Sequence, residues 1–232
     1  MPIKLSSRFS IEKAHAAQLQ LSKQVIKEDL LPETVSYVAG VDVAYAKGMS
    51  IGTVAVLDFA SLTIVESRAV CVKTRFPYIP TLLSYREISP VLLAIRKLQI
   101  RPDVYLVDGH GFAHPYRLGF ASHLGLVADA TTIGVAKRLL CGEVGPFDDQ
   151  RWAPIKDGGE LVGAAVISKT AQKPIYVSVG HRVSLKRAIS IVTQCTQVYR
   201  IPEPIRKAHL LAGEIKRKLA QEHTEYKKEK RL

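Results

Sequence analysis

The amino-acid sequence predicts an α/β fold: a mixed sheet that opens with an antiparallel three-strand meander, continues with parallel strands and is flanked by helices. Three β-rich runs, residues 37–45, 51–59 and 63–73, are joined by connectors that suit only antiparallel neighbours, because a parallel crossover needs a dozen or more residues. The next β-rich run, residues 103–108, follows a helical stretch long enough for such a crossover. We therefore expect it to lie parallel to the first run.

Two helices are predicted in the first half of the chain. Residues 10–31 alternate charged and apolar positions at helical spacing, with Ser10 suited to cap the helix and Pro32 expected to end it. Residues 81–98 carry a second helical pattern. Ser89-Pro90 is expected to break or restart this helix, since Ser favours an N-cap and Pro the first helical position.

The second half repeats the alternation of helices and strands. The patterns predict helices near residues 118–126 and 184–193 and strands at 132–135, 161–167 and 175–179. A last, basic helix begins at about residue 203, and residues 227–231 have the composition of a solvated, frayed tail. We expect a single domain over residues 1–232.

Length and composition limit the class of protein. A chain of 232 residues, 47% of them hydrophobic, can bury one substantial core, so a disordered protein is excluded. Thirty-three Lys and Arg against 21 Asp and Glu give a net charge of +12. This excess favours an anionic partner such as nucleic acid, whose phosphates the protein would neutralise. An ordinary basic soluble protein is the alternative.

The cysteines and the amino-terminal residues indicate the compartment. Cys71, Cys141 and Cys195 are odd in number and far apart, which disfavours a disulfide framework or a Cys-x-x-Cys zinc site and fits a reducing compartment. The amino-terminal residues have no apolar signal core, and no apolar stretch approaches the ~20 residues that span a bilayer. We expect a cytoplasmic monomer without a membrane partner.

Three acidic residues stand in settings that favour burial: Asp42 within one apolar run, Asp108 at the end of another, and Glu87 on the second predicted helix. An ionised carboxylate in an apolar strand is normally protonated, paired or bound to metal, because its desolvation is so costly. If the fourth strand lies parallel to the first, Asp42 and Asp108 are cross-strand neighbours. Two carboxylates ~4 Å apart repel by about 4 kcal/mol at an effective dielectric near 20, which favours a bound Mg²⁺.

Each acid also has a purely structural explanation. Asp42 fits an edge-strand residue that faces solvent, Asp108 before Gly109 fits a turn cap, and Glu87 beside Arg86 fits a surface ion pair. The three acids together carry more weight than any one of them, because the predicted strand order gives two of them a reason to meet.

The strand order is that of the ribonuclease H-like fold, and the sequence resembles the endonuclease V family, the deoxyinosine-directed nucleases of that group. The resemblance covers about residues 38–211 and rests on separate motifs in the same order. Residues 142–157 and the basic tail are where least can be transferred. The motifs are Gly40-Val41-Asp42-Val43-Ala44-Tyr45, Pro77-Tyr78-Ile79-Pro80, Leu83-Ser84-Tyr85-Arg86-Glu87, Val107-Asp108-Gly109-His110-Gly111, the spaced residues His114, Pro115, Arg117, Gly119, Ala121, Ser122, His123 and Gly125, Ile133-Gly134-Val135-Ala136-Lys137, and Val179-Gly180-His181-Arg182.

The resemblance implies a Mg²⁺-dependent DNA repair endonuclease, with Mn²⁺ expected to substitute. It would recognise deoxyinosine, a deaminated adenine, and hydrolyse the second phosphodiester bond on its 3′ side, leaving 3′-hydroxyl and 5′-phosphate ends. Asp42, Glu87 and Asp108 are then the metal-binding carboxylates, and His209 is a further catalytic group. Lys137, after a strand, would neutralise charge that develops on the phosphate. A solvated surface lysine and a satisfied, partly buried histidine are the alternatives for the last two.

A short loop between two prolines indicates a device that acts on stacked bases. Pro77 and Pro80 fix φ, so Tyr78 and Ile79 can be held outward at little further cost in entropy. Such a tip can wedge into a base stack and give access to an extruded nucleotide. The alternative is a loop packed below the sheet.

A flipped base needs a pocket, and the resemblance implies its elements: Leu83, Gly109, Gly111, Gly119 and Leu140. A pocket too tight for an exocyclic amine excludes guanine, and a backbone donor opposite the six position distinguishes hypoxanthine from adenine. The weaker pairing of a deaminated base also lowers the cost of extrusion.

Other interpretations fit the residues less well. A dinucleotide-binding fingerprint would need a third glycine where His114 stands, and a helical zinc pair of His110 and His114 is disfavoured by Gly111 and Pro115. An endoribonuclease that acts on inosine in RNA would share the metal site and differ in its contacts to the sugar. A non-catalytic, basic nucleic-acid-binding protein would explain the charge but not the carboxylates.

Overall fold

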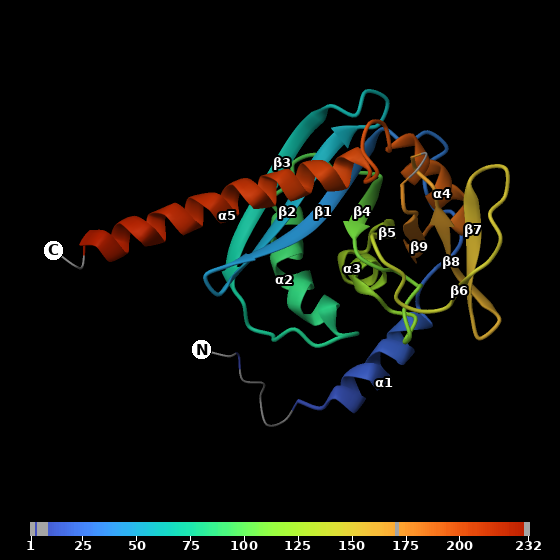
Figure 1. Ribbon diagram of the computed structural model, residues 1–232, viewed down its shortest axis with the longest axis horizontal. Coiled ribbons are helices and arrows are strands. Elements are labelled where there is room, and N and C mark those ends of the chain that lie inside the picture. Colours follow the sequence, from blue (N-terminus) through green and yellow to red (C-terminus); the bar gives the residue numbers. More distant parts are fainter. Residues whose placement is uncertain (1–2, 4–8, 170–171, 230–232) are drawn as a thin grey trace.

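The computed structural model describes residues 3, 9–169 and 172–229, with side chains described as far as residue 221. The three β-rich runs form the expected antiparallel meander of β1 (Tyr37–Ala46), β2 (Met49–Asp58) and β3 (Ile64–Lys73). In the described residues, nine strands make one mixed sheet in the order β3-β2-β1-β4-β5-β9-β8-β7-β6. Figure 1 shows helices on both faces of this sheet.

Parallel strands follow the meander, as predicted. β4 (Val104–Asp108) lies parallel to β1, and β5 (Thr132–Ala136) lies parallel to β4. The crossovers contain α2 (Leu83–Ile95) and α3 (Phe120–Ala128), because a parallel return needs a connection of this length. This mixed α/β architecture confirms the fold class.

The far half of the sheet is antiparallel and larger than the sequence indicated. β9 (Ile175–His181) pairs with β5, and β8 (Glu160–Val166) pairs with β9. The sheet then continues through β7 (Trp152–Asp157) and β6 (Glu143–Val144), neither of which was predicted. β7 was not predicted because it contains Pro154, and a proline within a short run argues against a strand.

Alternating side chains of the central strands supply a separate core on each face. One core contains Val38, Leu106 and residues of α4 (Leu185–Gln194) and α5 (Glu203–Glu229); the other contains residues of β1, β2, α2 and α3. Gly40 lets α5 approach β1 closely, because a Cβ at this position would lie 1.8 Å from the Pro204 carbonyl oxygen. The start of α5 is thereby fixed against the middle of β1.

Helix α1 (Ile11–Ser22) is shorter than predicted. Ser10 caps it as expected, accepting a hydrogen bond from the Lys13 N–H at 3.1 Å. The chain leaves the helix well before Pro32 because its backbone then pairs elsewhere: Ile26 accepts a hydrogen bond from the Arg182 N–H at 2.8 Å. Tertiary pairing has therefore replaced the last turns of the predicted helix.

Two other expectations about helices need correction. α2 continues through Ser89-Pro90 without a break, with Pro90 buried against β2 where Gly52 leaves room for it. α5 remains helical through residues 227–229, and residues 230 and 231 of the expected tail lie outside the described residues. In Figure 1, the carboxyl-terminal part of α5 projects beyond the sheet.

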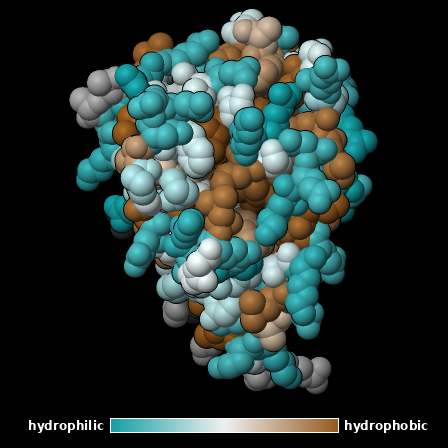
Figure 2. Space-filling model, turned by 90° about the vertical axis from the view of Figure 1, so that its right-hand side faces the viewer, coloured by the Kyte–Doolittle hydropathy of each residue, from teal (hydrophilic) through white to brown (hydrophobic). Residues whose placement is uncertain are grey.

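The surface away from the central strands carries both hydrophobic and hydrophilic side chains. Figure 2 views the side that carries the β6 to β9 half of the sheet, where hydrophobic side chains gather in the middle and hydrophilic ones surround them. Among the helices that the structure describes, none is both long and apolar enough to cross a membrane.

Candidate active site

Asp42 and Asp108 come together because β1 and β4 are parallel and in register. The pairing runs from Val38 opposite Val104 to Val41 opposite Val107, and each aspartate is the next residue on its strand. Asp42 is 8% exposed, and Asp108 ends β4 in a half-buried position. The expected cross-strand arrangement of the two residues is therefore present.

Glu87 approaches the same strands from α2, which covers the opposite face of the sheet from α5. Its carboxylate is 7% exposed and accepts a hydrogen bond from the Tyr45 hydroxyl at 2.9 Å. Burial raises the pKa of Glu87 to about 8; the Tyr45 hydrogen bond opposes this shift, and the charges of Asp42 and Asp108 add to it. Glu87 is thus a buried acid, not the surface ion pair that its sequence neighbour suggested.

Two basic side chains complete the group. Lys137, the residue after β5, places Nζ 2.5 Å from Asp108 Oδ2, and His209 on α5 places Nδ1 2.8 Å from Asp42 Oδ2. Burial raises the pKa of Asp108, with Lys137 opposing the shift and Asp42 adding to it. The His209 side chain is 66% exposed, so it is not a satisfied, partly buried histidine.

The donor set fits a hard divalent cation, although the side chains do not form a closed ligand cluster. Among the described residues, no three His, Cys, Asp or Glu side chains converge closely enough to hold a metal ion as they lie. Each acid instead contacts a neighbour of its own: His209, Lys137 or Tyr45. Three neighbouring carboxylates, two of them with raised pKa values, provide oxygen donors of the kind that Mg²⁺ prefers.

The proline-bracketed loop stands out from the surface. Tyr78 is 68% exposed at its tip, Pro80 is exposed, and Pro77 and Ile79 are half buried. The loop leads directly into α2, which carries Glu87. The alternative of a loop packed below the sheet does not hold for these residues.

A cavity of about 190 Å³ lies between this loop and the end of β4. It is lined by four of the five expected pocket residues, Leu83, Gly109, Gly119 and Leu140. Gly111 packs behind them, donating its N–H to Ser178 Oγ at 2.9 Å. The cavity is smaller than the ~300 Å³ typical of pockets for drug-sized ligands, which suits a single base.

Sequence reasoning missed other residues that line this cavity. They are Thr81, Ser84, His110, His114, Leu118 and Phe120, and Tyr78, predicted only as the wedge, also lines the cavity. The available signal was that Ser84, His110 and His114 stand in family motifs, but no pocket role was assigned to them. A larger hollow of about 580 Å³ lies at the opposite ends of the strands, around Arg101 and Arg182, and contains none of the three acids.

A ribonuclease H-like sheet that brings carboxylates to the adjoining positions of its central parallel strands defines the class: nucleases built on this fold. The family model for endonuclease V matches residues 19–210. Endonuclease V of Rippkaea orientalis is 49% identical over 212 residues, which cover 90% of this chain and 92% of that protein. The chain belongs to the endonuclease V family and is an enzyme.

Solved structures give the same family. The crystal structure of endonuclease V from Streptomyces avermitilis superposes with a TM-score of 0.83 at 36% identity, covering 97% of this chain and all of that one. Endonuclease V of Ciona intestinalis, in complex with a 24mer DNA containing an inosine followed by a ribo-adenosine, has a TM-score of 0.83 at 31% identity, over 90% and 98% of the two chains. Nucleic acid is thus the partner that these neighbours support.

Proposed function

We propose that this protein is a Mg²⁺-dependent DNA repair endonuclease that recognises deoxyinosine and hydrolyses the second phosphodiester bond on its 3′ side. The observation that carries the proposal is the meeting of three elements: two acids in register on parallel strands, a small cavity at the end of β4, and an exposed rigid tip beside it. The products would be a 3′-hydroxyl and a 5′-phosphate.

The carboxylates would hold the cation while the neighbouring bases manage charge. Asp42, Glu87 and Asp108 supply the oxygen ligands, and Mn²⁺ is expected to substitute for Mg²⁺. A bound Mg²⁺ would acidify water, orient the phosphate and stabilise the leaving oxygen. Lys137, which contacts Asp108, would offset charge on the phosphate, and His209, which is exposed and contacts Asp42, would act as a further catalytic group.

The wedge and the cavity would select the base. Tyr78 would enter the stack and the extruded base would occupy the cavity lined by Leu83, Gly109, Gly119 and Leu140. A close backbone at the glycines would leave no space for the exocyclic amine of guanine, which is how a tight pocket discriminates. Gly111 would support this wall from behind.

An inosine-directed endoribonuclease is the second candidate. The observation that favours it is that the Ciona intestinalis relative was solved with DNA in which a ribo-adenosine follows the inosine. The metal site would be the same, and the choice between the two functions would depend on the sugar beside the cut.

Matched strands test the proposal. Three labelled strands of one sequence would carry inosine in all-deoxy form, with one following ribonucleotide, or in all-ribo form. We expect Mg²⁺-dependent nicking of the all-deoxy strand at the second bond 3′ to the lesion, and none in EDTA. Nicking of only the ribonucleotide-containing strands would replace the DNA function by the RNA function, and nicking of none would reject both.

The wedge has a test of its own. Tyr78→Ala should weaken binding to a deoxyinosine duplex in Ca²⁺ by about tenfold, because base stacking on an aromatic side chain contributes ~1–3 kcal/mol, and it should leave binding to a plain duplex unchanged. Equal losses on both duplexes would reject the wedge. We further propose that the chain acts as a single-domain, cytoplasmic monomer, which light scattering and localisation would check.

A further inference from the structure

A fully buried glutamine joins the wedge loop to the wall of the base cavity. Gln18 lies on α1 and is 0% exposed. Its Nε2 donates to the Thr81 carbonyl oxygen at 2.9 Å and to the Leu118 carbonyl oxygen at 3.1 Å. Both acceptors belong to residues that line the cavity, and Thr81 directly follows Pro80 of the wedge. One side-chain amide thus connects two loops that are far apart in sequence.

The residue at this junction is held in a strained conformation. Thr81 has φ of 69°, a region in which a β-branched residue is rare and persists only when its surroundings hold it there. Besides Gln18, the His15 ring contacts Thr81 Oγ1 at 2.8 Å and the His114 ring bonds the Thr81 backbone. The strain therefore sits where the wedge loop meets the cavity.

The amino-terminal segment also braces the other end of the loop. The Phe9 and Phe76 rings meet edge to face at 5.2 Å, and the Tyr85 hydroxyl donates to the Ala14 carbonyl oxygen at 3.3 Å. Residues on both sides of the Pro77–Pro80 tip are thus tied to the amino-terminal segment, one to Phe9 just before α1 and one to α1 itself. Gln18 hydrogen-bonds the backbone of both loops, whereas His15 contacts the Thr81 side chain and stacks on the Tyr116 ring.

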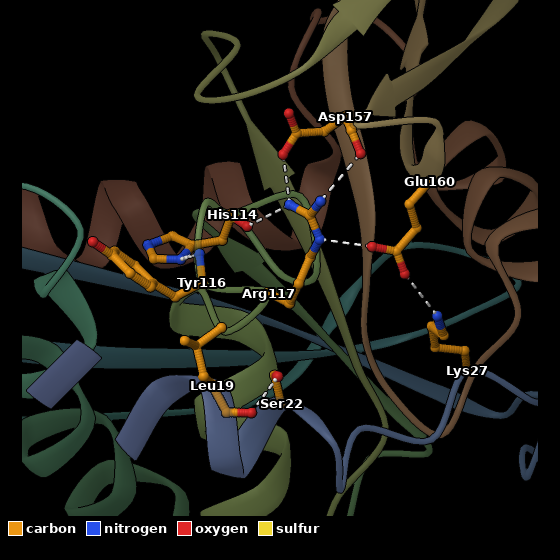
Figure 3. Close-up of polar contacts among 8 residues, drawn as sticks. All are labelled: Leu19, Ser22, Lys27, His114, Tyr116, Arg117, Asp157 and Glu160. Atoms are coloured by element: carbon orange, nitrogen blue, oxygen red, sulfur yellow. Dashed lines mark hydrogen bonds and ion pairs between the residues drawn. The ribbon is translucent and has the colours of Figure 1, made fainter. Parts of the chain in front are cut away.

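The cavity wall is anchored independently on its far side. Figure 3 shows Arg117 between Asp157 and Glu160, with Nη1 2.6 Å from Asp157 Oδ2 and Nε 2.8 Å from Glu160 Oε2. The same guanidinium donates to the His114 carbonyl oxygen at 3.0 Å. This anchor fixes the wall to the β7–β8 hairpin. The wall also meets the wedge loop directly, through the His114 ring at the Thr81 backbone, and Gln18 adds a second link between the two from α1.

The unpaired half of the Gln18 amide supports a role in positioning. Its Oε1 is buried without a hydrogen-bond partner among the described residues, which costs free energy that an apolar side chain of the same size would avoid. The residue keeps two long-range contacts at the expense of stability. Building on the proposed function, we propose that Gln18 is a positioning residue that holds the wedge and the base cavity in one fixed relation, so that extrusion of the base delivers it directly into the cavity.

The positioning role of Gln18 can be tested with Gln18→Met, which removes the amide and keeps the volume of the side chain. Gln20→Met makes the same change at an exposed position of α1 and is the matched control.

A deoxyinosine duplex with 2-aminopurine beside the lesion reports unstacking by fluorescence in Ca²⁺. We expect Gln18→Met to lose about tenfold in its preference for this duplex over a plain one, roughly the loss of one well-placed hydrogen bond, with a smaller fluorescence rise. Gln20→Met should match the wild type.

Thr81→Gly provides a second variant that relieves the backbone strain and so does not depend on the stability of Gln18→Met. It should show the same loss of preference, because glycine frees the junction. Unchanged preference and fluorescence in both variants, beside a wild type that selects deoxyinosine, would overturn the positioning role alone. A wild type without such selection would overturn this role and the proposed function together.

Discussion

Two glutamates with nearly equal exposure, Glu66 at 8% and Glu87 at 7%, are treated in opposite ways by this protein. Glu66 on β3 accepts hydrogen bonds from the N–H groups of Gln99 and Ile100 and pairs with Arg68 at 2.7 Å. Burial acts to raise the pKa of Glu66, but these partners outweigh it and hold the pKa below its ordinary value. Its charge is therefore fully compensated by the fold.

Glu87 lacks such compensation. Among the described residues its hydrogen-bond donor is the Tyr45 hydroxyl. Burial, helped by the charges of Asp42 and Asp108, raises its pKa to about 8 although Tyr45 and Arg86 oppose the shift. Asp108 contacts Lys137 and Asp42 contacts His209, yet the pKa values of Asp108 and Glu87 are still raised, so a bound cation would relieve the repulsion among the three acids. The two glutamates thus differ in the direction of their pKa shifts, and a raised pKa is the property expected of a functional acid.

The largest effect expected from this contrast is on catalysis. Asp108→Asn should lower the rate of Mg²⁺-dependent nicking by about a thousandfold, because loss of a ligand to the catalytic cation costs several kcal/mol of charge stabilisation. Glu66→Gln should nick at close to the wild-type rate. Single-turnover nicking of a deoxyinosine duplex measures the rates of both variants. Equal rates would contradict the distinction between the catalytic acid and the structural one.

The same pair of changes should act in the reverse order on stability. Glu66→Gln removes the charge that pairs with Arg68 and puts an N–H₂, which cannot accept a hydrogen bond, in place of one carboxylate oxygen, so the free energy of unfolding should fall by about 2 kcal/mol. Asp108→Asn removes one charge from a repulsive group and should unfold no more easily than the wild type. Urea denaturation in EDTA gives both values; a larger loss in Asp108→Asn would contradict the assignment.

A smaller effect should appear in the pH dependence of stability. Between pH 4.5, the ordinary pKa of glutamic acid, and about 8, the folded protein keeps a proton on Glu87 that the unfolded chain releases. Stability should therefore fall as pH rises through this window, by at most about 1.4 kcal/mol per pH unit for one proton. Glu87→Gln should lose this slope in EDTA. An unchanged slope would show that Glu87 is not the group responsible.

The fold was largely predictable because its signals are local. Short connectors required the meander, and helix-length gaps allowed the parallel strands. The failures have non-local causes: α1 ends early because Ile26 pairs with Arg182, and β7 contains Pro154 within a sheet that the sequence could not reveal. Pro90 stays helical because α2 packs against Gly52, a contact that no local pattern reports.

The candidate site was predictable to the extent that a residue's role follows from its strand or its motif. The proximity of Asp42 and Asp108 could be predicted from the strand order. The assignment of Glu87 to the same group depended on family resemblance, because its burial arises from the packing of α2. Gly111 was assigned to the cavity surface but lies behind it. Gln18 could not be found at all, since its two partners are 63 and 100 residues away along the chain.

Binding of Mn²⁺, followed by the electron paramagnetic resonance of the free ion, tests the central claim most directly. The wild type and Glu66→Gln should bind the ion with equal affinity, because the acid changed in the variant is already compensated within the fold. Asp42→Asn and Asp108→Asn should each bind at least about tenfold more weakly, as expected when a charged ligand is lost. Undiminished binding in both aspartate variants would contradict the account.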